Sequence, residues 1–209
     1  MVMLRESDVT VAAAMGIEAW AARRRVPRVA VQRVGIGART WTGAFTTPTV
    51  LSIGLAGGLR DDLKPGTVIV PGAVALEEAE PIACDPAWVA ALSESAWRLG
   101  HQVVEQPLVT ATHLVTGAER HAWAERGFAA VDMESAHLAG HGAGLAVVRV
   151  ILDTPERELS AKWERPWRAM LDPRLARQAL WLLPHSRRFA LRAAEVLADA
   201  LRRDINTEV

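Results

Sequence analysis

Two acidic residues that follow predicted β-strands are the side chains whose type and position best suit chemistry. Glu134 comes shortly after the apolar run 129–131, and Asp153 comes after the apolar run 146–151. In α/β proteins, the carboxyl ends of the strands border the crevice that binds ligands. A carboxylate there can accept hydrogen bonds from a sugar diol, and a buried acid with a raised pKa can donate a proton. The two residues therefore predict a site that holds hydroxyl groups and moves protons.

Both acids also have a purely structural interpretation, which the residues alone leave open. Glu134 would be stabilised at the start of a helix by the helix dipole, and Asp153 could cap a turn. Glu134, His137 and His141 share one helix face, as the ligands of a metal would. A carboxylate-bridged di-metal centre would need a second copy of this pattern, which the sequence lacks. We predict neither a metal nor a cofactor.

The elements that position these acids alternate along the chain. Apolar runs predict strands at 9–15, 29–34, 50–53, 67–70, 103–104, 108–111, 129–131 and 146–151. Helical patterns cover 18–25, 86–99, 117–126, 135–140 and 189–203. This alternation predicts an α/β fold with a mostly parallel sheet. The glycines of 54–58 predict a turn that brings backbone close to a ligand.

Composition and charge exclude several classes of protein. The 24 basic and 24 acidic residues cancel, so no electrostatic field favours nucleic acid as a partner. Cys84 is the only cysteine, which excludes an intrachain disulfide and a cysteine-based zinc site. Residues 1–8 lack the apolar core of a signal peptide, and no run approaches the roughly 20 apolar residues of a membrane helix. We expect a cytoplasmic protein without an integral membrane segment.

The final predicted helix is rich in arginine. Its basic residues alternate with Glu195 and Asp199, which predicts a solvated face. A helix that lies on a membrane surface is the alternative, because basic residues exceed acidic ones.

Three segments in order resemble the purine nucleoside phosphorylase / methylthioadenosine nucleosidase superfamily. They are the glycine-rich segment 52–59 with its continuation 63–70, the segment Val131–Ser135 and the segment Arg149–Asp153. The similarity runs from about Val9 to Trp163. It implies that residues 1–209 form a single nucleoside phosphorylase-like domain, in which helices flank a mixed, mostly parallel sheet.

The resemblance also implies roles for individual residues. Glu134 would bind the ribose diol, and Asp153 would serve the leaving base at N7. Glu18 falls on the glutamate of a nucleosidase segment that activates the attacking water. Further substrate contacts are implied for Met15, Ala56, Gly57, Leu114, Met133 and Trp163. Leu114 would take the base-stacking position that is often Phe, and Trp163 would cover the 5′ substituent.

Departures from the family pattern favour water over phosphate as the nucleophile. Phosphorylases of the family usually place an arginine at the position of Ser52 and a hydroxyl residue at that of Leu55, and both hold phosphate. Neither ligand is present here, although Arg39 or Arg60 could compensate. Leu152 replaces the serine that normally precedes the catalytic aspartate, which removes a supporting hydrogen bond.

The resemblance therefore predicts an N-ribosyl hydrolase that acts on a purine nucleoside or a 5′-substituted adenosine. The segments 132–135 and 149–153, with the arginine-rich C-terminal helix, most resemble the hopanoid-associated branch, which removes adenine from adenosylhopane. Trp163, Trp167 and Leu171 could contact such a lipid substituent. The alternatives are a phosphate-dependent phosphorylase and a catalytically silent nucleoside-binding protein. Family members are typically dimers or larger, so we expect a homodimer or a larger homo-oligomer.

Overall fold

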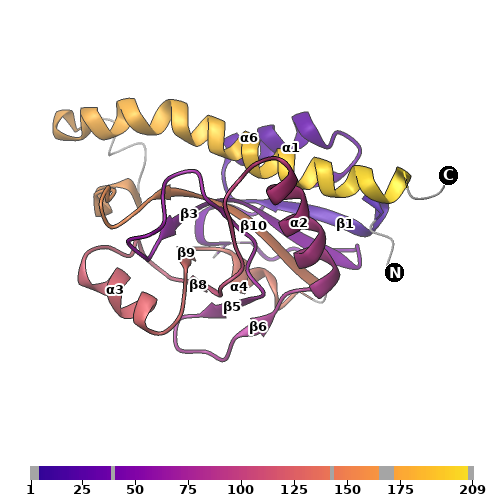
Figure 1. Ribbon diagram of the computed structural model, residues 1–209, viewed down its shortest axis with the longest axis horizontal. Coiled ribbons are helices and arrows are strands. Elements are labelled where there is room, and N and C mark those ends of the chain that lie inside the picture. The colour runs from indigo at the N-terminus through magenta and orange to yellow at the C-terminus, as the bar shows by residue number, and fades with distance from the viewer. Residues whose placement is uncertain (1–4, 39–40, 142–143, 165–171, 207–209) are drawn as a thin grey trace.

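The protein is an α/β structure in which helices cover a mixed sheet (Figure 1). The computed structural model describes residues 5–38, 41–141, 144–164 and 172–206. The strands are β1 Val9–Ala13, β2 Ala30–Arg33, β3 Thr49–Gly58, β4 Val68–Ile69, β5 Ala73–Leu76, β6 Ile82–Ala83, β7 Val103–Val104, β8 Leu108–Thr110, β9 Ala130–Asp132 and β10 Gly144–Asp153. The α-helices are α1 Gly16–Arg25, α2 Pro86–Arg98, α3 Ala118–Glu125, α4 Ser135–Leu138 and α6 Ala176–Asn206. The predicted fold class is confirmed.

Strand β3 is the centre of the sheet. It pairs in parallel with β1 on one side and with β10 on the other. Strand β1 ends at Ala13, and the last residues of β3, Gly57 and Gly58, pair instead with β9 in the antiparallel direction. The ends of β1, β9 and β10 therefore meet around the carboxyl end of β3.

The two faces of the sheet bury alternate residues of its central strands. Leu51 and Ile53 of β3 and Val148 of β10 pack in one core cluster with α1, α2 and α6. Val50 of β3 and Val147 of β10 lie in a second cluster with residues of α4. This period of two places Ser52 and Arg149 on the face of α4, opposite the long helix.

Strands β5 and β6 were not predicted, and two predicted segments near the site were wrong. The glycine-rich segment 54–58 is not a turn but the second half of β3, because β10 and then β9 pair with it throughout. The last helix begins at Ala176 rather than Phe189 and contains Pro184. Proline removes one helical hydrogen bond, but here it is exposed, while Leu182 and Phe189 on either side are buried and anchor the helix. No described helix is both long and apolar enough to cross a membrane.

Candidate active site

A pocket of about 390 Å³ opens at the carboxyl end of β3, and all nine residues predicted for the site line it. They are Met15, Glu18, Ala56, Gly57, Leu114, Met133, Glu134, Asp153 and Trp163. The fold thus brings together residues from segments separated by more than a hundred positions. Two further residues predicted to contact the substrate, Trp167 and Leu171, lie outside the described residues.

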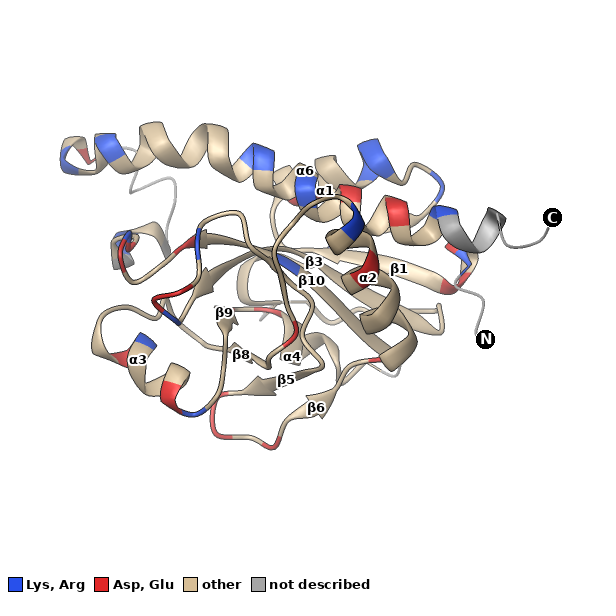
Figure 2. Cartoon of the chain, in the orientation of Figure 1, with Lys and Arg blue, Asp and Glu red and all other residues tan. Residues whose placement is uncertain are grey.

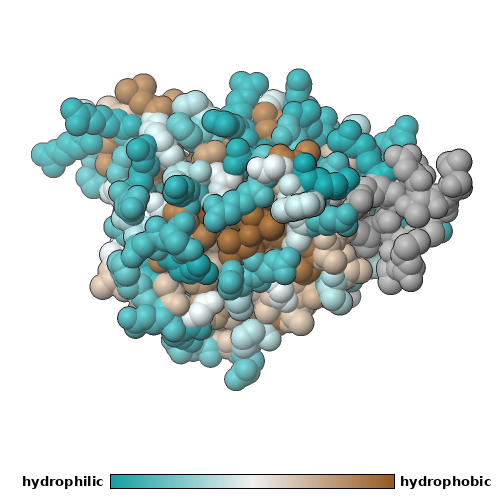
Figure 3. Space-filling model, viewed as in Figure 1, coloured by the Kyte–Doolittle hydropathy of each residue, from teal (hydrophilic) through white to brown (hydrophobic). Residues whose placement is uncertain are grey.

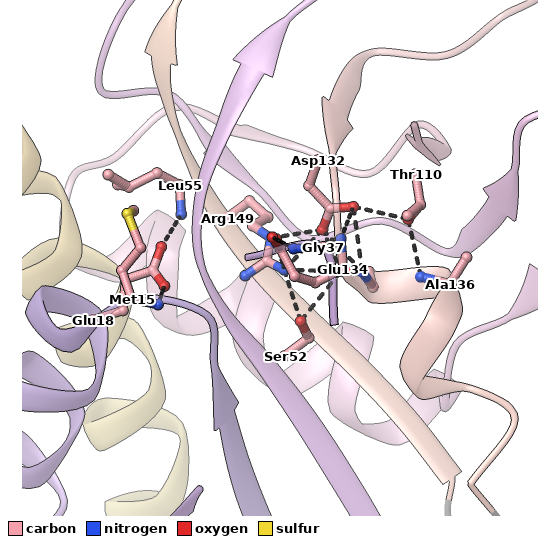
Figure 4. Close-up of polar contacts among 11 residues, drawn as sticks. Met15, Glu18, Gly37, Ser52, Leu55, Thr110, Asp132, Glu134, Ala136 and Arg149 are labelled. Carbon is pink, nitrogen blue, oxygen red and sulfur yellow. Dashed lines mark hydrogen bonds and ion pairs between the residues drawn. The ribbon is translucent and has the colours of Figure 1, made fainter. Parts of the chain in front are cut away.

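Glu18 connects the first turn of α1 to the central strand (Figure 4). Its Oε2 accepts a hydrogen bond from the backbone N–H of Met15 (2.8 Å), and its Oε1 accepts one from that of Leu55 (3.1 Å). The side chain is buried, and burial raises its pKa, while the nearby Arg149 cation acts in the opposite direction. Two fixed donors orient a carboxylate that retains lone pairs for a third partner.

Glu134 precedes α4 and is held from two sides. Its Oε1 accepts a hydrogen bond from the backbone N–H of Gly37 (2.8 Å), and its Oε2 lies 3.7 Å from Nη2 of Arg149. Burial, and then the negative charge of Asp132, raises the pKa of Glu134 to about 7, against the effect of Arg149. Its charge therefore changes close to neutral pH.

A buried polar network lies beside Glu134 (Figure 4). Arg149 Nε donates to Asp132 Oδ2 (2.8 Å), and its Nη2 donates to Ser52 Oγ (2.7 Å) and Ser135 Oγ (3.1 Å). Asp132 also accepts hydrogen bonds from the hydroxyls of Thr110 (2.8 Å) and Ser135 (2.5 Å). Every charge in this network has a partner of opposite sign, as burial requires. Arg149 of β10 therefore lies next to Ser52, the position at which the resemblance implies an arginine in phosphorylases.

Asp153 ends β10 and forms a buried ion pair with Arg120 of α3. Its Oδ2 also accepts a hydrogen bond from the backbone N–H of Leu159 (3.2 Å). Burial raises the pKa of Asp153, and the Arg120 cation limits that rise. The missing serine at Leu152 therefore does not leave this carboxylate unsupported, since Arg120 and Leu159 hold it.

Arg120 is the functional candidate that the sequence analysis missed. It is 1 % exposed, and it donates through Nη1 to the carbonyl of Gly58 (2.7 Å) and through Nε to that of Val115 (3.1 Å). Its Nε also lies 3.3 Å from Oε1 of Glu158. The sequence gives no signal for this residue, because an arginine in a short polar helix is usually solvated. Asp132 and Arg149 did carry a signal, because charged residues within buried strands must pair with each other.

The lining of the pocket is poorly suited to phosphate. Among the described residues it contains no lysine or arginine but four carboxylates, from Glu18, Asp132, Glu134 and Asp153. Arg60, which could have compensated, does not line the pocket and pairs with Asp62; Arg39 lies outside the described residues. No group of three or more His, Cys, Asp or Glu in the described part of the chain is placed to hold a metal ion.

The outer part of the pocket is apolar and includes α6. Trp163 is half-buried, and its Nε1 donates a hydrogen bond to Oε1 of Gln178 (2.7 Å). Leu182, Leu183 and Ser186 of α6 complete this wall. The sequence analysis did not foresee these three residues, because it started the helix beyond them.

Several solved structures share the fold. A Helicobacter pylori MTAN mutant with 5′-methylthioadenosine in its active site superimposes with a TM-score of 0.74 at 17% identity, covering 94% of this chain and 99% of that one. The 5′-methylthioadenosine/S-adenosylhomocysteine nucleosidase of Neisseria meningitidis gives 0.72 at 18% identity, over 94% and 99% of the two chains. The futalosine hydrolase of Helicobacter pylori gives 0.71 at 18% identity, over 93% and 97%.

At the level of sequence, no curated protein matches the chain. The family model described as "Phosphorylase superfamily" does match, over residues 36–168. This span is more than half of the chain and includes both Glu134 and Asp153. The chain therefore belongs to the phosphorylase superfamily.

Proposed function

We propose that this protein is an N-ribosyl hydrolase that cleaves the glycosidic bond of a purine nucleoside. The observation that carries the proposal is the pocket itself, where Glu18, Glu134 and Asp153 face one apolar cavity without a basic side chain among its described lining residues. Burial raises the pKa of all three. Raised pKa values at converging carboxyl groups are typical of sites that transfer protons near neutral pH.

The spacing of the carboxylates suits a nucleoside held between them. Glu18 lies against Gly54 and Asp153 lies against Gly57, which are three residues apart on β3. At about 3.3 Å per residue, these two positions on β3 are roughly 10 Å apart along the strand. The base and the acid would therefore contact different parts of a nucleoside that lies along the strand, with the sugar and the attacking water between them.

Each acid then has one task in the reaction. Glu134 accepts hydrogen bonds from the ribose hydroxyls, and Glu18 removes a proton from the water that forms a bond with C1′. The bond between C1′ and the base nitrogen breaks, and Asp153 gives its proton to the departing base. Neutralising the base while positive charge develops on the sugar is the demanding step, so the acid contributes mainly to the transition state.

For the substrate, we propose an adenosine with an apolar 5′ substituent, for which adenosylhopane is one candidate. The support is the apolar outer wall formed by Trp163, Leu182 and Leu183. Each methylene that this wall buries would contribute about 0.8 kcal/mol. The 5′-methylthioadenosine in the similar Helicobacter pylori structure is a smaller ligand of the same chemical type.

Adenine release from adenosine, 5′-methylthioadenosine and adenosines with longer 5′ alkyl chains tests both parts of the proposal. We expect release without phosphate, and a kcat/KM that rises with chain length. A maximum at the methyl compound would contradict the long substituent, and no release from any compound would contradict the hydrolase.

The same assay distinguishes the hydrolase from the two alternative functions, a phosphorylase and a catalytically silent nucleoside-binding protein. If added phosphate strongly increases turnover and ribose 1-phosphate accumulates, the protein is a phosphorylase. If calorimetry shows adenine binding but prolonged incubation yields no product, the protein only binds nucleosides.

A further inference from the structure

The first half of α6 exposes a stripe of basic and apolar side chains. Exposed residues recur at intervals of three to four along it, at Arg177, Leu180, Leu183 and Arg187, and Arg188 follows directly. Leu180 is 74% exposed and Leu183 is 62% exposed, and their spacing of three residues makes them neighbours on the helix surface. From residue 173 to residue 194 the sequence has five arginines and no acidic residue, although the whole chain is neutral. We call this surface, formed by the five exposed residues above, the α6 stripe.

A basic groove runs beside the α6 stripe. It has a volume of about 630 Å³, and its lining combines His101, Arg187, Arg188 and Arg192 with a single carboxylate, Glu195, which pairs with Arg25. Two of these cations are held in place by the fold. The Arg187 guanidinium lies 4.8 Å from the centre of the Trp20 ring, and Arg192 donates a hydrogen bond to the carbonyl of Gly66. Fixed guanidinium groups around a groove suit the phosphate of a lipid headgroup.

The α6 stripe also adjoins the mouth of the candidate active site. Leu183 belongs both to the stripe and to the wall of the pocket, where Leu182 and Ser186 are its neighbours. This part of α6 extends past the edge of the sheet (Figure 1), and arginines mark it at both ends (Figure 2). Hydrophobic atoms lie among hydrophilic ones on the same projecting end (Figure 3). A surface that met the stripe would therefore lie next to the pocket opening.

We propose that the α6 stripe binds the surface of a bilayer that contains anionic lipids. Amphipathic helices that lie on membranes combine exposed leucines with flanking arginines, as this helix does. The leucines enter the boundary between headgroups and acyl chains, and the arginines contact the phosphates. A second copy of the chain fits less well, because a two-fold contact would bring the arginines of the two stripes together, while Glu195, the carboxylate of the groove, is already paired with Arg25. A lipid surface docked here places the pocket mouth where an amphiphilic substrate leaves the bilayer.

Sedimentation of the full chain with phosphatidylcholine vesicles, with and without phosphatidylglycerol, tests the proposal. We expect binding to the mixed vesicles, little binding to pure phosphatidylcholine, and a loss of binding as salt increases. The variant Arg177→Gln/Leu180→Ser/Arg188→Gln should lower the partition coefficient more than 20-fold, since each arginine contributes about fivefold. The matched control Trp97→Ser/Leu99→Ser removes two exposed apolar residues on α2 and its C-cap, and it should bind as the parent does.

Three results would overturn the proposal. The first is equal binding of parent and variant to the mixed vesicles. The second is a parent that ignores vesicles but changes its mass in light scattering when the stripe is substituted, which would assign the stripe to a second copy. The third is binding of inorganic phosphate without any binding to vesicles.

These measurements do not depend on the proposed reaction. None of the three substituted residues lines the pocket, so the variant should cleave the small substrate 5′-methylthioadenosine as the parent does. A protein that binds vesicles but cleaves no nucleoside would contradict the proposed function alone. A protein that cleaves nucleosides but ignores vesicles would contradict the α6 stripe alone.

Discussion

The three pocket carboxylates with raised pKa values differ in the donors that hold them. Glu18 accepts hydrogen bonds from two backbone amides, and Glu134 accepts one from a backbone amide and lies near Arg149. Asp153, at the end of β10, pairs directly with Arg120 of α3. Because a charged partner and burial have opposite effects on an acid, these donors give the three groups different tendencies to hold a proton. Substitutions of the three side chains are therefore expected to affect rate, binding and stability differently.

Replacing Asp153 should separate chemistry from binding. Asp153→Asn keeps the shape of the side chain but removes the proton donor, so we expect kcat to fall by about 10² to 10⁴ while nucleoside affinity changes little. It also leaves Arg120 without its buried anion, with only the half-buried Glu158 as an anionic partner, which should cost at most about 3–5 kcal/mol of stability. The double variant Asp153→Asn/Arg120→Met should regain part of that stability and none of the rate. Steady-state kinetics, calorimetry and thermal unfolding measure the three effects, and near-native kcat in Asp153→Asn would place the acid elsewhere.

Glu134 should make the stability of the protein depend on pH. Its pKa is about 7 in the folded protein and 4.5 in its ordinary state. The stabilising contribution of its proton is fully present below pH 4.5 and is lost as the pH rises through 7, because the unfolded chain ionises first. The variant Glu134→Gln lacks this loss, so its melting temperature relative to the parent should increase between pH 5 and pH 8. A difference in melting temperature between variant and parent that stays constant across this pH range would contradict the raised pKa of Glu134. The same variant should also weaken nucleoside binding.

At the scale of elements, β3 decides where the candidate catalytic residues meet. Its backbone pairs with β1, β9 and β10, and its glycines leave space for side chains from neighbouring elements. Helix α3 contributes in a second way, because Arg120 reaches from it to the end of β10. Changes in either element should therefore alter the site without removing a carboxylate.

Gly54 is the residue of β3 where this can be tested. A Cβ atom there would lie 2.4 Å from Oε1 of Glu18 and 2.7 Å from Nη1 of Arg149, so both side chains would have to move. We expect Gly54→Ala to lower kcat by about 100-fold, since displacement of a catalytic group by 1 Å can cost that much. Gly140→Ala is the control, because a Cβ at Gly140 meets nothing within 4 Å. Equal kinetics in the two variants would show that Glu18 does not need its present position.

Helix α3 should set the pH range of the reaction through Arg120. Removing its positive charge in Arg120→Met should raise the pKa of Asp153 further, so the high-pH limb of the kcat profile should shift to higher pH. Arg120→Lys keeps a charge and should leave the limb closer to that of the parent, at a lower rate. If Arg120 only stabilises the fold, melting temperatures will fall while the limb stays in place in both variants.

At the scale of the whole molecule, the open apolar mouth of the pocket raises the question of what covers it. Ile36 and Leu183 line the pocket and are both exposed at the surface. The resemblance to a family of oligomers suggests a neighbouring subunit at the sugar end, while the α6 stripe suggests a lipid surface at its other side. The two contacts are compatible if they use different parts of the rim.

We predict that the protein is a homodimer or larger in solution. One chain has a mass of 22.7 kDa, so light scattering at micromolar concentration should give about 45 kDa or more. The physical reason is the apolar rim, whose burial against a second chain would stabilise both. A strict monomer across this concentration range would contradict the prediction, and the parent chain without lipid is the sample to measure.

The sequence by itself determined the elements that depend on local pattern. Apolar runs predicted eight of the ten described strands, all except β5 and β6, and the α/β class. The helical pattern 86–99 predicted α2, whose first turn is capped by the side chain of Asp85. All nine residues that the family resemblance predicted for the site line the pocket, because a motif specifies both the type of each residue and its spacing along the chain. The substrate roles of these residues remain predictions.

Only the tertiary structure decided which distant residues support the predicted pocket residues. The pairing of Asp153 with Arg120 joins positions 33 residues apart, and neither residue's neighbours in the sequence indicate it. The glycine-rich half of β3 looked like a turn because glycine has a low strand propensity, yet two neighbouring strands pair with it. Likewise, the helical pattern was predicted only from residue 189, but burial of the residues around Pro184 carries α6 through from Ala176. Local sequence sets the conformational preference of each segment, whereas packing between segments supplies the free energy that overrides this preference. The same packing brings Arg120 and Arg149 into contact with Asp153 and Asp132.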